Sequence, residues 1–385
     1  MATRREIQDR RASLKRTLRG DCLTKLTPGT LAPSLREMAE QYDVSRTVAA
    51  QVLQELIEEG LLYTVPRVGT FIGAPVRSTS DDYLLLVPHD EHDPVRQRNA
   101  AICAGFEERI AQLGGSALCL TQARAHAAHA EGVLPPLAGV FELEWEDETA
   151  PFWADSAQIV QRVRFRTGST AQRFDTVSFD DVDGGRKAAG HLMARGHRRI
   201  AFVGLHAVKN GQPLWSRERE AGWEEALSGA GLATHGFAFH PRRAGESLTL
   251  EQEKAMAREA IAPLVKLIKA GDQPPITAVV AANDTAAQEL LQALEAARVP
   301  SEHWPSLVGF DDNPDLAGHL MTSLRLPWDD LGRAAANVLW KRRHGELEAG
   351  PHDERVPMKL ISRLTCRRDW PQSAAHAALV TVTIG

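Results

Sequence analysis

Three neighbouring residues, Ser45, Arg46 and Thr47, form a small polar and basic cluster at the start of a stretch with regularly spaced apolar residues. Hydroxyl and guanidinium groups donate hydrogen bonds to base edges and to phosphate oxygens. They reach DNA when they occupy the first turn of the second helix of a helix-turn-helix. The cluster therefore indicates a DNA-reading surface, provided that the surrounding sequence supplies the two helices.

The surrounding sequence predicts both helices. Ser34, followed three residues later by Glu37, forms a capping box that starts the first helix. Apolar residues then recur at helical spacing, at Leu35, Met38, Ala39 and Tyr42. The second helix begins near Ser45, ends at Gly60 and has an apolar face formed by Val48, Val52 and Leu56. We expect the cluster to face DNA while the later residues of this helix pack inward.

A β-hairpin is predicted immediately after Gly60. The segment "LLYTVPRVGTFIG" contains two short runs of strand-forming residues around Pro66 to Gly69. Such a wing beside a recognition helix can lay small residues against the sugar-phosphate chain. Gly69 and Thr70 are the candidates for that contact.

These linked motifs resemble the winged-helix domain of the GntR superfamily, over about residues 5–73. The matching segments are "PSLREMA", "VSRTVAA", "EGLL" and "RVGTFI". The resemblance implies DNA contacts from Ser34, Arg36, Ser45, Arg46, Thr47, Gly69 and Thr70. The chain departs from the family pattern at two places. Ala50 stands where a second DNA-reading arginine is usual, and Arg67-Val68 stands where Gly-Arg is usual. These departures predict an operator that is narrower or differently read. A winged helix used only for protein contacts is the alternative.

The remaining chain alternates short apolar runs with helical patterns, which predicts parallel sheets with helices on both faces, divided into two lobes. Ligands of such sheets bind beyond the carboxyl ends of the strands. Asp284 follows a predicted strand, and Arg219 lies near the start of a helix. A carboxylate accepts hydrogen bonds from the vicinal hydroxyls of a sugar, and a guanidinium donates hydrogen bonds in a fixed planar arrangement to a hydroxyl pair or a carboxylate. The alternatives are a helix cap for Asp284 and a surface ion pair for Arg219.

This region resembles the effector domain of the LacI/GalR repressors, which shares its fold with periplasmic sugar-binding proteins. The matching motifs are "DGGRKAAGHLMARGHRRIAFVG", "RERE" followed by "AGW", "AANDTAAQELL", "SLVGFDD" and "TSLRLPWDDLGRAA". The resemblance implies effector contacts from Arg219 and Asp284. Asp180 matches a residue near the lobe crossover, where an effector contact and a hinge role are both open. Together the two resemblances are typical of the arabinose-repressor subgroup of GntR regulators.

Further candidates for effector binding come from position and residue type. His89 and Asp90 follow the first strand of the N-terminal lobe and are expected to face the effector. Trp153, Trp215 and Trp328 stand in loop-like segments, and Trp215 is the candidate for stacking on a sugar. His126 and His129, three residues apart and without a third ligand, are read as solvated histidines.

Composition excludes several classes of protein. The chain of 385 residues is 43% hydrophobic and 25% charged, as in an ordinary globular protein, with a net charge of −5. Residues 1–20 nevertheless hold seven basic against two acidic side chains, which suits a polyanionic partner. Four scattered cysteines suggest neither a zinc site nor a redox pair. We expect reduced thiols and, without a signal peptide or an apolar span, a cytoplasmic location.

The sequence therefore predicts a winged helix over residues 1–75, a linker over 76–82, a two-lobed α/β effector domain of the periplasmic-binding-protein type over 83–370, and a tail over 371–385. The expected function is that of a homodimeric transcriptional regulator, a repressor that binds double-stranded operator DNA and a small sugar-like effector between the lobes. No catalytic residue, cofactor or metal is expected. The alternatives are a pyridoxal-phosphate aminotransferase-like regulator and a solute-binding protein.

Overall fold

The computed structural model describes most of the chain as two compact units. The described residues are 11–20, 32–58, 61–65, 69–72, 81–88, 93–143, 161–165, 175–206, 213–242, 249–271, 274–314, 316, 320–348 and 350–366. The chain leaves the first unit after Ser178, returns to it after Pro327 and leaves it again after Arg355. Within the described residues, no helix is both long enough and apolar enough to cross a membrane.

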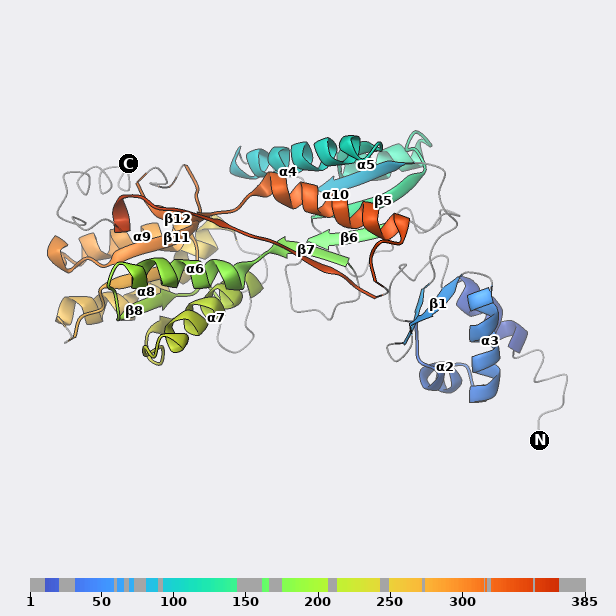
Figure 1. Ribbon diagram of the computed structural model, residues 1–385, viewed down its shortest axis with the longest axis horizontal. Coiled ribbons are helices and arrows are strands. Elements are labelled where there is room, and N and C mark those ends of the chain that lie inside the picture. Colours follow the sequence, from blue (N-terminus) through green and yellow to red (C-terminus); the bar gives the residue numbers. More distant parts are fainter. Residues whose placement is uncertain are drawn as a thin grey trace. The chain divides into compact units, whose positions relative to one another are not determined.

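The N-terminal elements lie close together (Figure 1). Their side chains form a small apolar core. Residues 11–20 are helical, and α2 (Leu35–Gln41) and α3 (Arg46–Glu58) follow. The core is formed by Leu14, Leu18, Ala32, Met38, Ala49, Val52, Leu53, Leu56 and Leu62. The predicted capping box is confirmed, because the Ser34 hydroxyl accepts from the Glu37 amide and the Glu37 carboxylate accepts from the Ser34 amide.

The predicted hairpin is also confirmed. Strands β1 (Leu62–Val65) and β2 (Gly69–Ile72) pair antiparallel, with Leu62 opposite Ile72 and Val65 opposite Gly69. The amide of Ala32 donates to the carbonyl of Thr70 at 2.7 Å. This bond joins the hairpin to the segment that enters α2, so the wing and the helix pair form one structure.

A six-stranded sheet forms the centre of the first unit, in the order β13-β7-β6-β5-β3-β4. Its strands are β3 (Asp82–Val87), β4 (Ser116–Thr121), β5 (Leu137–Glu142), β6 (Gln161–Phe165), β7 (Asp175–Phe179) and β13 (Asp353–Val356). Its helices are α4 (Asp93–Gln112), α5 (Gln122–Ala130) and α10 (Trp328–His344), of which α4 and α10 lie side by side (Figure 1). The pairings from β7 to β4 are parallel, as the alternating pattern predicts.

The second unit has a sheet of the same size, in the order β14-β12-β11-β10-β8-β9. Its strands are β8 (Ile200–Val203), β9 (Ala238–Phe239), β10 (Ala278–Ala281), β11 (Ser306–Asp311), β12 (Thr322–Arg325) and β14 (Lys359–Ile361). Its helices are α6 (Asp181–Ala194), α7 (Leu214–Gly229), α8 (Leu250–Ala270) and α9 (Asp284–Ala296), with short turns η1 (Ser301–His303) and η2 (Leu364–Cys366). Only β14 runs antiparallel to its neighbour among these pairs.

Two glycines let α6 and α7 approach at backbone distance. A Cβ at Gly185 would collide with the carbonyl of Arg219, and a Cβ at Gly222 would collide with the carbonyl of Val182. Larger residues at either position would push the helices apart. This contact fixes the α7 turn that carries Arg219 against the start of α6.

Two assignments made from the sequence are wrong. Trp215 lies in the first turn of α7 and Trp328 is the first residue of α10, so neither stands in a loop. Both residues stand at the very start of a helix, where the helical spacing of apolar residues has not yet begun to show. His126 and His129 are exposed on α5, in keeping with the expectation for them. Trp153 and residues 76–80, which are most of the expected linker, lie outside the described residues.

Candidate functional site

The first candidate site is the exposed surface formed by the starts of α2 and α3. All five residues expected there, Ser34, Arg36, Ser45, Arg46 and Thr47, are exposed. On the opposite side of α3, Ala49, Val52 and Leu56 are buried. The helix therefore has one packed face and one polar face, as the sequence predicts.

The start of α3 is suited to binding an anion. The Ser45 hydroxyl accepts from the Val48 amide at 3.2 Å, so Ser45 caps the helix besides standing in the exposed cluster. The first turn of α3 contains no acidic residue. The positive end of the helix dipole and the exposed Arg46 side chain both favour a phosphate there.

Arg36 and the wing complete this surface. The Nε of Arg36 donates to Glu40 at 2.9 Å, and both side chains are largely exposed, at 73% and 66%. Exposed pairs of this kind are weak, so Arg36 can exchange Glu40 for a phosphate. Thr70 is half-buried and stands beside Gly69 in β2. Arg67 and Val68 lie outside the described residues.

The second candidate site lies at the carboxyl edge of the second unit's sheet, where Arg219 is held from several sides. Its Nε donates to Oδ1 of Asp181 at 2.7 Å, and one terminal nitrogen donates to the Ala282 carbonyl at 2.6 Å. The guanidinium lies 4.7 Å from the Trp215 ring centroid and 4.3 Å from that of Phe310. The expected alternative of a surface ion pair is wrong, because Arg219 and Asp181 are both buried.

Asp284 is fully buried beside the same edge. One oxygen accepts from the Asn313 amide at 2.9 Å and the other accepts from the Ser323 hydroxyl at 2.8 Å. Burial, together with the charge of Asp311, raises the pKa of Asp284 well above its ordinary value. The alternative of a helix cap is wrong for this residue, because the Asn283 side chain caps α9 by accepting from the Ala286 amide at 2.9 Å.

Asp311 lies near both residues, at the end of β11. One of its oxygens is 3.9 Å from a terminal nitrogen of Arg219, and its side chain is 38% exposed. Asp311 and the next residue, Asp312, have φ angles of 102° and 55°. Asp312 is held by Arg325 at 2.6 Å and Arg363 at 2.5 Å. Such strained backbone clusters at ligand sites when the surroundings enforce it.

Glu253, at the start of α8, adds a further carboxyl group. Burial and the neighbouring Asp311 raise the pKa of Glu253 to about 7, against the opposing effects of Asn283 and Arg219. Asn283 donates to Glu253 at 3.3 Å. The edge therefore gathers one guanidinium and several carboxyl groups, a donor and acceptor set suited to a ligand rich in hydroxyls.

The other expected effector residues have separate positions. Trp215 is half-buried and stacks on Arg219 from one turn before it on α7. Asp180 caps α6 by accepting from the Asp183 amide at 2.9 Å, and the next residue, Asp181, pairs with Arg219 instead. His89 and Asp90 lie outside the described residues.

Sequence reasoning missed Asp181, Glu253 and Asp311. Asp311 stands in a quoted motif at the end of a predicted strand, so its position was a usable signal. Asp181, two residues after the apolar run that forms β7, had the same signal, and Glu253 had none. It also missed a buried ionic group in the first unit, where Glu142 at the end of β5 accepts from Arg162 at 2.6 Å and Arg164 at 3.0 Å. All three of these side chains are less than 10% exposed.

Known proteins match both parts of the chain. Residues 12–72 match the family described as "Bacterial regulatory proteins, gntR family", and residues 189–366 match the "Periplasmic binding protein-like domain". The HTH-type transcriptional regulator CelR of Thermobifida fusca is 31% identical over 191 residues, which are 46% of this chain and 48% of that protein. The chain thus spans about half the length of that curated relative.

Two longer matches cover most of the chain. The arabinose metabolism transcriptional repressor of Geobacillus stearothermophilus is 24% identical over 339 residues, which are 82% of this chain and 85% of that protein. A solved structure described as a transcriptional regulator CelR–cellobiose complex has a TM-score of 0.54 at 23% identity, and the match covers 87% of this chain and all of that one. This likeness shows the fold. The chain joins a gntR-family helix-turn-helix domain to a two-lobed domain of the periplasmic-binding-protein type.

Proposed function

We propose that this chain is a ligand-responsive transcriptional regulator, a repressor that is not an enzyme and acts in the cytoplasm. The observation that carries the proposal is the polar face of α3, where Arg46 and Thr47 are exposed above a packed core and beside a wing. The relatives support it, because their names describe helix-turn-helix regulators and a repressor. We propose the boundaries 1–75, 76–82, 83–370 and 371–385 for the winged helix, linker, effector domain and tail.

The DNA contacts proposed are those of the α2 and α3 starts and the wing. Arg46 and Thr47 reach base edges, Ser34 and Arg36 contact phosphates, and Gly69 and Thr70 lie along the backbone. A homodimer would place two such surfaces on a pseudo-palindromic operator. A small effector, sugar-like in its hydroxyl groups, binds at the edge lined by Arg219, Asp284 and Asp311. Cellobiose occupies a structurally similar regulator, which supports this class of ligand.

The first experiment is a selection of DNA fragments on the full-length protein, followed by a titration of the enriched operator. We expect Arg46→Ala to lower operator affinity about 5- to 150-fold, since one good arginine contact contributes about 1–3 kcal/mol. Arg124→Ala, which removes an exposed arginine from α5, is the matched control and should leave affinity unchanged. Equal affinities for wild type and Arg46→Ala would overturn the proposed DNA surface.

The second experiment is a thermal-shift screen against monosaccharides, disaccharides and uronic acids. A ligand at 100 times its dissociation constant adds about 2.7 kcal/mol of stability. The Asp284→Asn variant keeps one acceptor for the Asn313 amide and offers a donor to Ser323, so it should fold and lose the ligand-induced shift. Glu295→Gln, on the same helix, should keep it. Loss of the shift in both variants would contradict a role specific to Asp284.

Coupling between the two sites follows from differential affinity. We propose that the effector releases the operator, which requires it to bind the DNA-free state more tightly. The operator titration is repeated at saturating effector and should then give a weaker affinity. An unchanged affinity would disprove the coupling and leave the two binding activities standing.

A further inference from the structure

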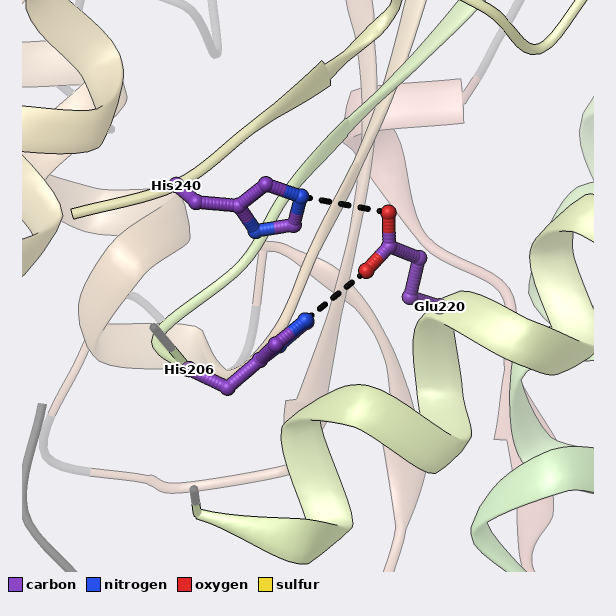
Figure 2. Close-up of side chains that lie close together, drawn as sticks. All are labelled: His206, Glu220 and His240. Atoms are coloured by element: carbon purple, nitrogen blue, oxygen red, sulfur yellow. Dashed lines mark ion pairs between the residues drawn. The ribbon is translucent and has the colours of Figure 1, made fainter. Parts of the chain in front are cut away.

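Three side chains of the second unit that are distant in sequence meet in one cluster. His206 follows β8, Glu220 lies on α7 and His240 follows β9. Nε2 of His206 is 2.9 Å from one carboxylate oxygen of Glu220, and Nε2 of His240 is 3.2 Å from the other. Figure 2 shows the carboxylate reaching toward both imidazoles, with one oxygen directed at each. The ligand atoms all lie within 4.8 Å of one another.

The cluster is sheltered from solvent. The side chains of His206, Glu220 and His240 are 5%, 18% and 14% exposed. The cluster thus offers imidazole nitrogens and carboxylate oxygens as donor atoms within reach of one ion.

A second layer of contacts orients His206. Its Nδ1 lies 3.0 Å from the Ser216 hydroxyl, which in turn accepts from the Leu205 amide at 2.9 Å. The hydroxyl can accept a hydrogen bond from Nδ1–H while Nε2 binds a metal, and it can donate a hydrogen bond to Nδ1 when Nε2 carries the proton. Hydrogen bonding of the outer ring nitrogen is the usual support of a metal-binding histidine.

The backbone beside His240 leaves room for its ring. A Cβ at Gly204 would lie 2.6 Å from Nδ1 of His240 and 3.3 Å from Cε1 of His206. The two rings stand 4.6 Å apart between centroids. Nδ1 of His240 is buried and has no hydrogen-bond partner among the described residues, so of the two rings His206 has the hydrogen-bonded outer nitrogen.

We propose that His206, Glu220 and His240 bind a divalent transition-metal ion of the zinc class. Two imidazoles and one carboxylate are the donor set of many three-ligand zinc sites, which keep a fourth position for water or a ligand. Imidazole nitrogens favour zinc and its neighbours over magnesium and calcium, which prefer oxygen. The ion takes the place of the Nε2 protons that now hydrogen-bond to Glu220, and each neutral imidazole then carries its proton on Nδ1.

Such an ion would join three elements at the carboxyl edge of the sheet. It would connect the segments after β8 and β9 to the second turn of α7. Glu220 is the residue next to Arg219, so metal binding stiffens the turn that carries the proposed effector contact. The inference concerns a separate set of ligands and does not depend on the proposed DNA or effector binding.

The test uses full-length protein with any affinity tag removed and metal stripped by a chelator. Zinc is titrated in competition with a chromophoric chelator, and cobalt is titrated while its visible absorption is recorded. We expect one zinc per chain and cobalt bands typical of nitrogen and oxygen coordination. Glu220→Gln and His240→Ala should each weaken zinc binding more than about 100-fold, and Ser216→Ala about 10- to 100-fold.

Two controls separate this site from adventitious binding. Glu224→Gln on α7 and His235→Ala, both at exposed positions, should bind zinc as wild type does. Circular dichroism of the stripped variants checks that they fold, and Glu220→Gln, being nearly isosteric, is the variant least prone to misfold. Zinc binding below one per chain, or binding unchanged in Glu220→Gln, would overturn the proposal and leave a hydrogen-bonded polar clamp.

Discussion

Arg219 and Asp181 form a buried ion pair with 2.7 Å between Nε and Oδ1, and it fastens the second turn of α7 to the first residue of α6. Their side chains are 4% and 8% exposed. The close approach of the two helices at Gly185 and Gly222 makes this pair possible, because it brings the α7 backbone against the α6 start. A proposed ligand contact thus also stabilises the fold.

Removing one member of this pair should be strongly destabilising. We expect Arg219→Met to lower the free energy of unfolding by about 3–5 kcal/mol, since it leaves the Asp181 carboxylate buried without a partner. Arg186→Met is the matched control, because Arg186 on α6 pairs with Asp183 and Glu225 but is 48% exposed. Its effect should stay within about 1 kcal/mol. Urea unfolding followed by circular dichroism measures both, and equal losses would contradict the buried pair's role.

The strained backbone at Asp311 predicts that relieving the strain raises the free energy of unfolding and lowers effector affinity. Its φ of 102° is unfavourable for a residue with a side chain, and glycine adopts it freely. We expect Asp311→Gly to raise the free energy of unfolding by about 1 kcal/mol, the relieved strain less the entropy of the added glycine. The same variant should lose effector affinity. A destabilised variant in thermal unfolding, or one that binds effector normally, would count against a functional origin of the strain.

Glu253 predicts a specific dependence of stability on pH. Its pKa in the folded protein, about 7, lies above the ordinary value of 4.5. Between these values the unfolded chain has released the proton and the folded chain retains it, so stability falls as pH rises through that window. We expect wild type to lose roughly 1–3 kcal/mol relative to Glu253→Gln between pH 4.5 and 8.

The difference between these two proteins isolates Glu253 from Asp284, whose raised pKa acts in the same direction in both. The groups that face Glu253 are Asp311, Asn283 and Arg219. Denaturant midpoints at several pH values provide the measurement. Parallel pH profiles for wild type and Glu253→Gln would show that this carboxyl group ionises normally.

The Arg36–Glu40 pair predicts opposite effects of its two members on DNA binding. Glu40→Gln removes the competing carboxylate, so operator affinity at low salt should rise about two- to fivefold, the range of a weak helix pair plus one removed charge. Arg36→Ala should weaken binding and reduce the slope of log affinity against log salt by about 0.9 if it contacts one phosphate. Fluorescence anisotropy across a salt series tests both. Glu131→Gln, an exposed glutamate at the end of α5, is the control, and a matching gain in that variant would mean a nonspecific charge effect.

The sequence alone determined the N-terminal elements and the α/β class. The capping box of Ser34 and Glu37, the polar start of α3 and the hairpin are made by residues a few positions apart, so their local spacing carries the information. The alternation of strands and helices likewise identified most elements of both sheets. The helices α5 and α8 and the short strands β9, β13 and β14 were not predicted, because no apolar run or family motif marked them.

Tertiary structure decided which side chains meet. Cys103 and Cys119 show the point: nothing in their spacing indicated a pair, yet the two thiols interact, which lowers the pKa of Cys103 and raises that of Cys119. Asp181 and Arg219 are likewise separated by 38 positions, and His206 and His240 stand on different strand ends. Parallel strands bring their carboxyl ends to one edge only when the sheet assembles, so strand order decides these neighbours and periodicity along the chain does not.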